Sequence, residues 1–502
     1  MEELKNALGQ CFWVGINGTE ADEESTRAIF KEFQPAGIIL FQRNVESIEQ
    51  VQRLNRDLQK QSSIPLLIAV DQEGGVVERL HKIIGSIPPA MAFTASGSKL
   101  TTRRLHQAHA RILRLLGFNV NFTPVLDLAL ASSNNGLGTR CFSSDPRTVK
   151  EYAEMVIAAH QKSGVMPCGK HFPGLGDTDR DSHLDLPSVS RPWRKILKQD
   201  LAPYKALLQK LPFIMINHAL YPDMDDQSVA SLSQRIVRDF LLQSMRYKGL
   251  SVSDDLIMGA VSKFHGLPES AEKALIAGNH LFLICRPEGV VEAYRTLLKK
   301  AQSDAALSQA IFLGSTRVLA LKARRRAKLA PKWEIGKEID MMAALSDQVS
   351  RGSVTLLHGS RMRALPGSCT VYLPRTKWIQ DESNALTDFL KSQRCKVQTF
   401  CYPLDVTREQ AHQLAQQSAA ADWTIVVLAN SSQHNGQISL LRQLVHDGKK
   451  VGVISGAYPE DAIPGTVKVA VASYWTAPSA LEAAVMAMFG IQKARGKLPL
   501  RR

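Results

Sequence analysis

The chain has 502 residues, of which 62 are Lys or Arg and 47 are Asp or Glu, so its formal charge is 62 − 47 = +15. With 44% hydrophobic and 22% charged residues, the composition is that of a folded globular protein and excludes a disordered, collagen-like or coiled-coil chain. At ~100–200 residues per domain, the length predicts two or three domains, or one large barrel and a smaller unit.

Several features bear on location and partners. No apolar stretch reaches the ~20 residues that a membrane span requires, and the acidic start Met1–Asn6 lacks the apolar core of a secretory signal. The seven cysteines are scattered and form no Cys-x-x-Cys pair, which favours a reducing compartment and no structural zinc. We therefore expect a cytoplasmic protein with no membrane partner.

Positive charge is concentrated in Lys322–Lys332 and Lys493–Arg502. Neither segment is interleaved with aromatic residues, and basic runs of this kind are typical of solvated helix ends or linkers. We expect no nucleic-acid partner.

The first two thirds of the chain alternate short apolar runs with stretches of helical periodicity. The strand candidates are Phe12–Ile16, Gly37–Phe41, Leu66–Asp71, Val120–Leu126, Val165–His171, Phe213–His218, Leu250–Asp254 and Leu281–Cys285. Between them, apolar residues recur every three or four positions in Ser47–Gln61, Lys99–Leu116, Arg147–Ser163 and Ser233–Tyr247. Eight βα units in about 300 residues predict a (β/α)8 TIM-like barrel over residues 1–330. A doubly wound open sheet is the alternative, because sequence does not show closure.

After a linker at residues 331–345, the pattern resumes in a shorter unit, residues 346–502. Its strand candidates are Val354–Leu357, Thr370–Leu373, Val397–Phe400, Thr424–Leu428, Val451–Ile454 and Val467–Ala472. Its helix candidates are Asp381–Ser392, Arg408–Ala421, Ile438–Asp447 and Ala477–Gly490. Alternation of this kind predicts a three-layer α/β sandwich with a mainly parallel sheet.

Polar residues follow several of the predicted barrel strands, namely Asp71, Asp127, Lys170-His171, Asn217-His218 and Asp254-Asp255. Turn chemistry alone would explain one such residue. Because the active sites of these barrels lie at the carboxyl ends of the strands, their recurrence favours a polar pocket on one rim.

Nucleotide motifs are missing. Gly136-x-Gly138 is followed by Cys141 and Gly174-x-Gly176 by Asp179, where a dinucleotide-binding motif has a third glycine, and no P-loop motif occurs. We expect no cofactor.

The stretch from Lys170 to His183 is rich in acids and bases and holds two glycines that permit a tight loop. In an extended loop, Asp181 and His183 project on the same side. A carboxylate there can hold one imidazole nitrogen and leave the other free to exchange a proton, as a histidine acid/base requires. The alternative is a metal-binding or merely solvated polar loop.

Two further stretches carry carboxylates near glycines or strand ends. Adjacent Asp254 and Asp255 could cap a helix, bind a cation or include a nucleophile. In Asp71–Gly75, two glycines allow the backbone to approach a ligand, and Asp71 could accept hydrogen bonds from hydroxyl groups; an ordinary turn is the alternative.

Taken together, these residues resemble the family 3 glycoside hydrolases, and within them the bacterial β-N-acetylglucosaminidases (β-hexosaminidases) of cell-wall recycling. The resemblance covers about residues 8–330, and residues 340–502 resemble more faintly the α/β sandwich domain of many members. The matching motifs are Val70–Gly75, Pro124–Asp127, Arg140–Pro146, Lys170–Gly174, Asp181–His183 and Ser253–Leu256.

The resemblance implies a retaining exo-glycosidase that removes terminal β-linked N-acetylglucosamine from a small carbohydrate, a muropeptide or a chito-oligosaccharide. Asp254 is then the nucleophile of a double displacement, and His183, held by Asp181, is the acid/base. The positions that match sugar-binding residues of the family are Asp71, Arg79, Arg140, Lys170 and His171. No metal is implied.

The Asp181–His183 loop also implies a barrel that is catalytically self-sufficient, because family β-glucosidases generally take a glutamate acid/base from the second domain. The second domain would then be structural or would narrow access to the active site. The chain departs from the family pattern at Val76, where arginine is usual, at Leu175, where histidine is common, and at His280, where aspartate is usual.

Four alternatives remain open. One is a phosphorylase, since a histidine acid/base carries no negative charge to repel phosphate; phosphate-dependent turnover would identify it. Another is a family 3 β-glycosidase of other sugar specificity. A third is a metal-dependent hydrolase using Asp254, Asp255, His171 and His218, although no H-x-H or H-E-x-x-H spacing supports it. The last is a carbohydrate-binding protein on an inactive barrel, which would not turn over aryl glycosides.

Overall fold

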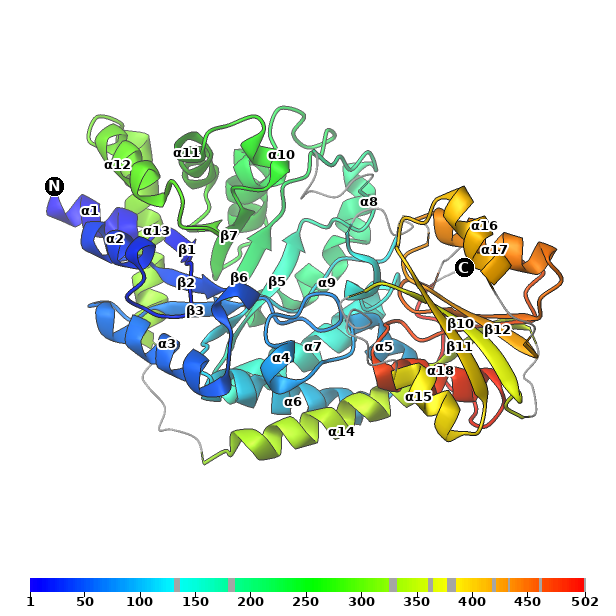
Figure 1. Cartoon of the computed structure of the whole chain (residues 1–502). Helices are drawn as coiled ribbons and strands as arrows, with labels where there is room; N and C mark the ends of the chain where they lie inside the picture. The colour runs from blue at the N-terminus through cyan, green and yellow to red at the C-terminus, as the bar shows by residue number, and fades with distance from the viewer. Residues whose placement is uncertain are drawn as a thin grey trace.

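Eight parallel strands close into a barrel in sequence order, β1 to β8 (Figure 1). The computed structural model describes residues 1–130, 136–178, 186–324, 332–359, 364–376, 385–417, 421–431, 434–459 and 463–500. Closure through β1 and β8 confirms the barrel and excludes the open sheet. The strands are β1 (Phe12–Gly15), β2 (Gly37–Leu40), β3 (Leu67–Val70), β4 (Val120–Asn121), β5 (Met166–Phe172), β6 (Phe213–Ile216), β7 (Leu250–Asp255) and β8 (Leu281–Ile284).

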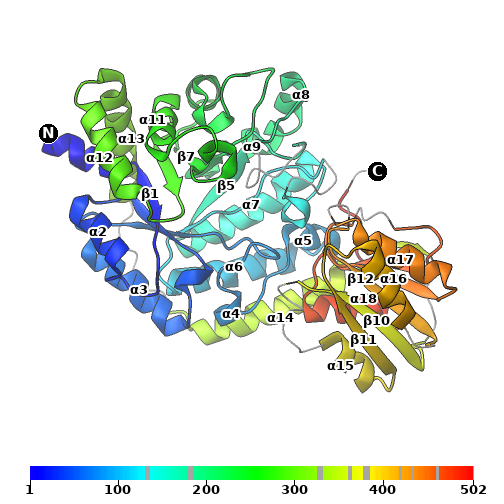
Figure 2. The ribbon, with the colours of Figure 1, turned by 45° about the horizontal axis from the view of Figure 1, so that its top comes forward.

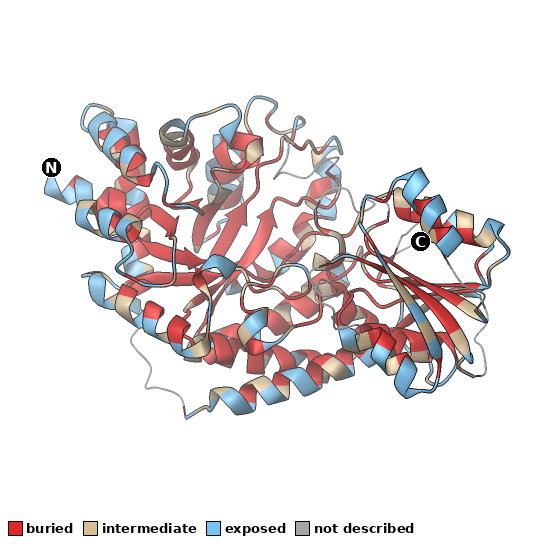
Figure 3. Cartoon of the chain, viewed as in Figure 1, coloured by how far each residue is buried: buried red, intermediate tan, exposed pale blue. Residues whose placement is uncertain are grey.

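These strands are apolar on both faces because both faces are covered, as Figure 3 shows. Alternate residues point inward and outward. Trp13, Leu67 and Leu283 belong to the inner cluster, whereas their neighbours along the strands pack in the outer core beneath the helices. Val318, from the helix α13 (Ala305–Arg324), joins the inner cluster, so α13 covers one end of the barrel.

Helices surround the barrel (Figure 2). Besides α13 they are α1 (Glu2–Gly9), α2 (Glu24–Glu32), α3 (Ile48–Gln61), α4 (His81–Ile84), α5 (Ala90–Ser96), α6 (Lys99–Leu115), α7 (Pro146–Ser163), α8 (Trp193–Lys198), α9 (Leu201–Leu207), α10 (Gly259–Ser262), α11 (Leu267–Ala277) and α12 (Val290–Ala301). Short 3-10 helices are η1 (Gln42–Asn44), η2 (Gly138–Arg140), η3 (Leu208–Lys210) and η4 (Ala230–Leu232), and η5 (Arg235–Ser244) is a π-helix. Among the described residues, none of these helices combines the length and apolar character needed to cross a membrane.

Local chemistry accounts for the ends of α7. Asp145 caps its start by accepting a hydrogen bond from the backbone N–H of Thr148, and Pro146 occupies the first turn, where no N–H partner is needed. Gly164 ends the helix with φ of 80°, a conformation that favours glycine.

The fourth strand is shorter than expected. A strand over Val120–Leu126 is predicted, but β4 pairs only at Val120 and Asn121. Pro124 has no backbone N–H to donate to a ladder, so regular pairing stops before it. An isolated bridge still joins Val125 to Lys170 of β5.

The rest of the chain forms a six-stranded sheet of order β11-β10-β12-β13-β14-β9, parallel except where β9 joins β14. The strands are β9 (Thr355–Gly359), β10 (Ser368–Pro374), β11 (Lys396–Tyr402), β12 (Trp423–Leu428), β13 (Val451–Ser455) and β14 (Val469–Ala472). One face packs against α15 (Ala385–Ser392) and α18 (Pro478–Met488), and the other against α16 (Arg408–Gln417) and α17 (Gly436–His446). The three-layer α/β sandwich is confirmed.

The segment between the two units is mostly helical. The helix α14 (Ile335–Ser353) runs along α5 and α6, and Glu338 accepts a hydrogen bond from Arg111 at 3.0 Å (Figure 1). Side chains from the second unit, such as Tyr474 just after β14, share the hydrophobic core of the barrel. Ser143, on the barrel, donates its hydroxyl to the carbonyl of Pro499 at 2.5 Å. The two units are therefore packed against one another.

Candidate active site

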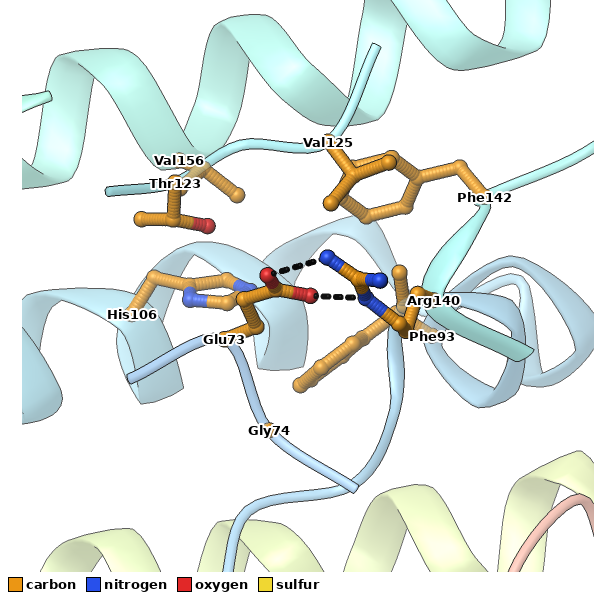
Figure 4. A pocket seen from close by; sticks show the side chains of 10 residues that line it. Glu73, Gly74, Phe93, His106, Thr123, Val125, Arg140, Phe142 and Val156 are labelled. Atoms are coloured by element: carbon orange, nitrogen blue, oxygen red, sulfur yellow. Dashed lines mark hydrogen bonds and ion pairs between the residues drawn. The ribbon is translucent and has the colours of Figure 1, made fainter. Parts of the chain in front are cut away.

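The ends of β3 and β5, together with the short helix η2, bring four acidic and basic side chains into contact. Lys170 Nζ lies 2.7 Å from Asp71 Oδ1 and 2.5 Å from Glu73 Oε1. Arg140 donates to both oxygens of Glu73, each at 2.9 Å, and Figure 4 shows the two side chains facing one another. Asp71, Glu73, Arg140 and Lys170 are called the ion cluster below. Asp71 is its most accessible member, with 16% of its side chain exposed.

The charges of the ion cluster support one another. Burial alone would raise the pKa of Glu73, but Arg140 and Lys170 outweigh it and hold that pKa well below its usual range. Burial likewise opposes the charge of Lys170, yet Asp71 and Glu73 raise its pKa. Glu73, Arg140 and Lys170 are therefore charged at neutral pH, and the ion cluster presents fixed donors and acceptors at the rim.

His171 extends the ion cluster. Its Nδ1 lies 2.6 Å from Asp127 Oδ2, and its Nε2 lies 3.3 Å from Arg140 Nη2. Asp127 also accepts the backbone N–H groups of His171 and Leu175, at 3.1 and 2.8 Å. The buried Asp127 therefore fixes both the imidazole and the start of the loop that follows β5.

The two carboxylates at the end of β7 differ. Asp255 Oδ1 accepts the backbone N–H groups of Cys285 and Ile257, at 3.0 and 3.3 Å, and burial raises the pKa of Asp255 to about 6. Asp254 is half-buried, and its Oδ1 accepts the backbone N–H of Asp255 at 2.8 Å. Asp255 therefore anchors the turn, which leaves Asp254 as the better candidate for chemistry.

The remaining predicted residues have different outcomes. The Arg79 guanidinium lies 5.5 Å from the centre of the Phe41 ring, and within the described ranges no hydrogen bond or ion pair joins it to the ion cluster. Its role in sugar binding stays a prediction. Asp181 and His183 lie outside the described residues.

Sequence reasoning assigned no role to Glu73 or to the contacts of Asp127. Both lie in the quoted motifs, and Glu73 follows Asp71 by two residues. The closeness of Glu73 to Asp71, a predicted ligand residue, is the sequence signal for a role of Glu73 in the site. Its pairing with Arg140 leaves no such signal, because Arg140 is 67 positions away.

The second sheet faces the rim beside the ion cluster. A cavity of about 240 Å³ lies between Gly75, Val76 and Leu137 of the barrel and residues that follow strands of the second sheet, including Asn430 and Trp475. Val76, one of the departures from the family pattern, therefore lines an interdomain cavity.

Three buried histidines lie behind Glu73 on α6 and α7. His106 lines a small enclosed pocket beside Glu73 and Thr123 (Figure 4). The rings of His109 and His160 follow it, with centroids 6.4 Å apart for His106 and His109 and 5.6 Å apart for His109 and His160. Burial lowers the pKa of His106 to about 3 and of His160 to about 4, and that of His109 well below its usual value. All three imidazoles are therefore neutral in the folded protein.

We expect the free energy of unfolding to fall as the pH drops below ~6.5. In that range histidines of the unfolded chain become protonated, whereas the three buried imidazoles of the folded protein stay neutral. The unfolded state binds more protons in this range, so stability rises with pH; at pH 5 each imidazole costs about 2 kcal/mol relative to pH 7. Urea unfolding of wild type and His109→Leu between pH 5 and 7.5 tests this. The variant should show a shallower slope, by about one proton, and an unchanged slope would contradict the expectation.

Comparison with known proteins agrees with this geometry. The sequence model described as "Glycosyl hydrolase family 3 N terminal domain" matches residues 3–321. The chain is 36% identical to a beta-hexosaminidase of Tolumonas auensis over 274 residues, which cover 54% of this chain and 81% of that protein. It is 32% identical over 332 residues to a beta-hexosaminidase of Idiomarina loihiensis, with 64% and 97% covered.

A solved structure extends the similarity to the second sheet. The family 3 beta-N-acetylglucosaminidase of Paenibacillus sp. str. FPU-7 superposes with a TM-score of 0.87 at 29% identity, covering 99% of this chain and 98% of that one. The match spans the barrel with its ion cluster and the α/β sandwich together. By its sequence and its architecture, the chain belongs to glycosyl hydrolase family 3.

Proposed function

We propose that the chain is a retaining exo-β-N-acetylglucosaminidase, an O-glycosyl hydrolase that removes terminal β-linked N-acetylglucosamine. The observation that carries the proposal is the ion cluster, whose acidic and basic side chains pair with one another at the barrel rim, beside the carboxyl ends of β3 and β5. The beta-hexosaminidases and the beta-N-acetylglucosaminidase that the chain resembles over its whole barrel support the sugar class.

The ion cluster suits the non-reducing end of a sugar. Lys170 and Arg140 donate to hydroxyl oxygens, and the more accessible Asp71 accepts from hydroxyl groups. These contacts hold the ring so that Asp254 attacks the anomeric carbon and displaces the aglycone, which leaves a covalent glycosyl–enzyme. His183, oriented by Asp181, gives a proton to the departing oxygen and later takes one from the water that releases the sugar.

The substrate that we propose is a muropeptide or a chito-oligosaccharide with terminal N-acetylglucosamine, met in the cytoplasm. A panel of aryl β-glycosides that differ only at C2 tests the sugar class. We expect the 2-acetamido substrate to have the highest kcat/KM, and glucoside turnover of equal efficiency would contradict the proposal. Added phosphate should leave the rate unchanged and yield free N-acetylglucosamine, because water is the proposed acceptor.

His183→Ala should lower kcat most for substrates whose leaving group must be protonated as it departs. We expect a loss of about 10²–10⁴-fold on chitobiose, whose departing hydroxyl is strongly basic, and a far smaller loss on a dinitrophenyl glycoside. Asp181→Asn should show the same bias in milder form. Steady-state kinetics on both substrates checks this, and equal losses would assign His183 to binding.

A further inference from the structure

A second large cleft lies at the opposite end of the barrel from the ion cluster. It has a volume of about 650 Å³ and lies where β6 and β7 begin, against α13. Figure 1 places α13 on the side of the barrel away from the second sheet. This basal cleft, as we call it, is therefore separate from the sugar-binding rim.

The basal cleft is strongly basic. Its charged lining residues among the described part of the chain are Lys210, Lys248, Arg317 and Arg324, with no Asp or Glu. Lys210 pairs with Glu154. No carboxylate within the described ranges lies in ion-pairing distance of the other three, so the basal cleft carries about three uncompensated positive charges.

Arg317 is held in place by a neutral partner. The half-buried guanidinium has Nη1 3.1 Å from Nε2 of His280, and the buried His280 has its Nδ1 2.8 Å from Ser251 Oγ. Burial, and then the charge of Arg317, lower the pKa of His280 to about 3, so the imidazole orients the guanidinium without neutralising it. Holding an uncompensated charge in a partly buried position is costly, and an anion would remove that cost.

Most of the uncharged lining is apolar and provides a floor, formed by Leu208, Leu211, Pro212, Leu250 and Leu321, although Gln161 and Gln209 also line the cleft. A volume of this size lies in the range of small-molecule sites, about 300–1,000 Å³. An apolar floor beside oriented cations matches a ligand with a flat apolar part and a phosphate group. The bounded volume favours such a molecule over an extended polyanion.

We propose that the basal cleft binds a phosphorylated small molecule of nucleotide size. Arg317 holds a phosphate group through charge-assisted hydrogen bonds, Lys248 and Arg324 add charge at the rim, and the aliphatic floor contacts the base. The site is independent of the glycosidase chemistry, since none of these residues belongs to the ion cluster or to β7's carboxyl end.

Isothermal titration of the full chain with ATP, AMP and inorganic phosphate tests the proposal. We expect saturable binding of ATP that weakens with added salt, and weaker binding of AMP and phosphate. Arg317→Met should lower the affinity for ATP about tenfold or more. Lys248→Ala and Arg324→Ala, at exposed positions where folding is not at risk, should each lower it severalfold. Circular dichroism and aryl-glycoside turnover without ATP should match wild type in all three variants.

Lys299→Ala is the matched control, because it removes one positive charge from an exposed site on α12 outside the basal cleft. It should leave ATP binding unchanged. Failure of the wild type to bind ATP, or equal weakening by Lys299→Ala, would overturn the proposal. If ATP does not bind but heparin does, and Arg317→Met weakens the binding of heparin, the proposal is also overturned. That result would indicate a surface for an extended polyanion. Phosphate binding as tight as that of ATP would overturn the nucleotide-sized ligand.

Discussion

Asp254→Ala is expected to lower kcat by about 10³-fold or more while the free energy of unfolding changes by less than about 1 kcal/mol. The carboxylate is the group that forms the covalent intermediate in the proposed reaction. Asp255 is committed to the backbone N–H groups of Cys285 and Ile257. Steady-state kinetics and urea unfolding measure the two effects.

Asp255→Asn is the matched control, since it changes the neighbouring carboxylate and keeps an oxygen that can accept the same backbone hydrogen bonds. It should lose less than about tenfold in kcat, because its role is positional. A 5-fluoro glycosyl fluoride, which keeps the 2-acetamido group and slows release of the sugar, should label Asp254. Mass spectrometry that placed the label on Asp255 would falsify the assignment.

Azide supplies an independent test. In the cavity left by Asp254→Ala, this small anion can attack the anomeric carbon of an activated aryl glycoside from the side that the carboxylate occupied. We expect azide to restore part of the turnover and to give the α-glycosyl azide. Restoration with a β-linked product would point to another nucleophile.

Glu73→Gln should lower both stability and activity. Glu73 is the shared counter-ion of Arg140 and Lys170, with 6% of its side chain exposed, and the neutral amide would leave two buried cations facing one another with less compensation. Breaking a buried ion pair on one side costs about 3–5 kcal/mol. Displacement of Lys170 and Arg140 should also lower kcat/KM by about 10²-fold.

Glu154→Gln provides the comparison. Glu154 also pairs with two lysines, Lys150 and Lys210, but its side chain is 33% exposed. We therefore expect Glu154→Gln to lower the free energy of unfolding by less than about 1 kcal/mol. Thermal and urea unfolding of both variants, with kinetics on the same aryl glycoside, would show the contrast. If Glu73→Gln and Glu154→Gln lowered the free energy of unfolding equally, burial would not make the ion pairs of Glu73 more important for stability than the exposed pairs of Glu154.

The sequence predicted the barrel and most of one rim because strand periodicity and strand-end chemistry are local. Asp71, Lys170 and His171 each follow or end an apolar run, and closure of the sheet brings those ends together. The length of β4 was overestimated, since Val125 and Leu126 are apolar enough for a strand while Pro124 interrupts the ladder.

What sequence could not supply was pairing across long separations. The contact between Glu73 and Arg140 depends on how two loops meet over the closed barrel, and no periodicity reports it. The same holds for the division of labour between Asp254 and Asp255, which is decided by which carboxylate reaches the N–H of Cys285 on β8. The buried histidines of α6 and α7 lie on the apolar faces of these helices, and the sequence pattern alone does not indicate that their imidazoles are buried together.

The hydrogen bond from Ser143 to Pro499 joins residues 356 positions apart. During synthesis on a ribosome, the barrel strands emerge long before Pro499. The segment that carries Arg140 and Ser143 therefore gains its hydrogen bond to Pro499 only after the α/β sandwich has been synthesised. Domains generally fold as they emerge, amino-terminal first. The rim of this barrel is therefore completed late, and a nascent chain stalled within the second sheet would carry every residue of the ion cluster without the support that holds its edge.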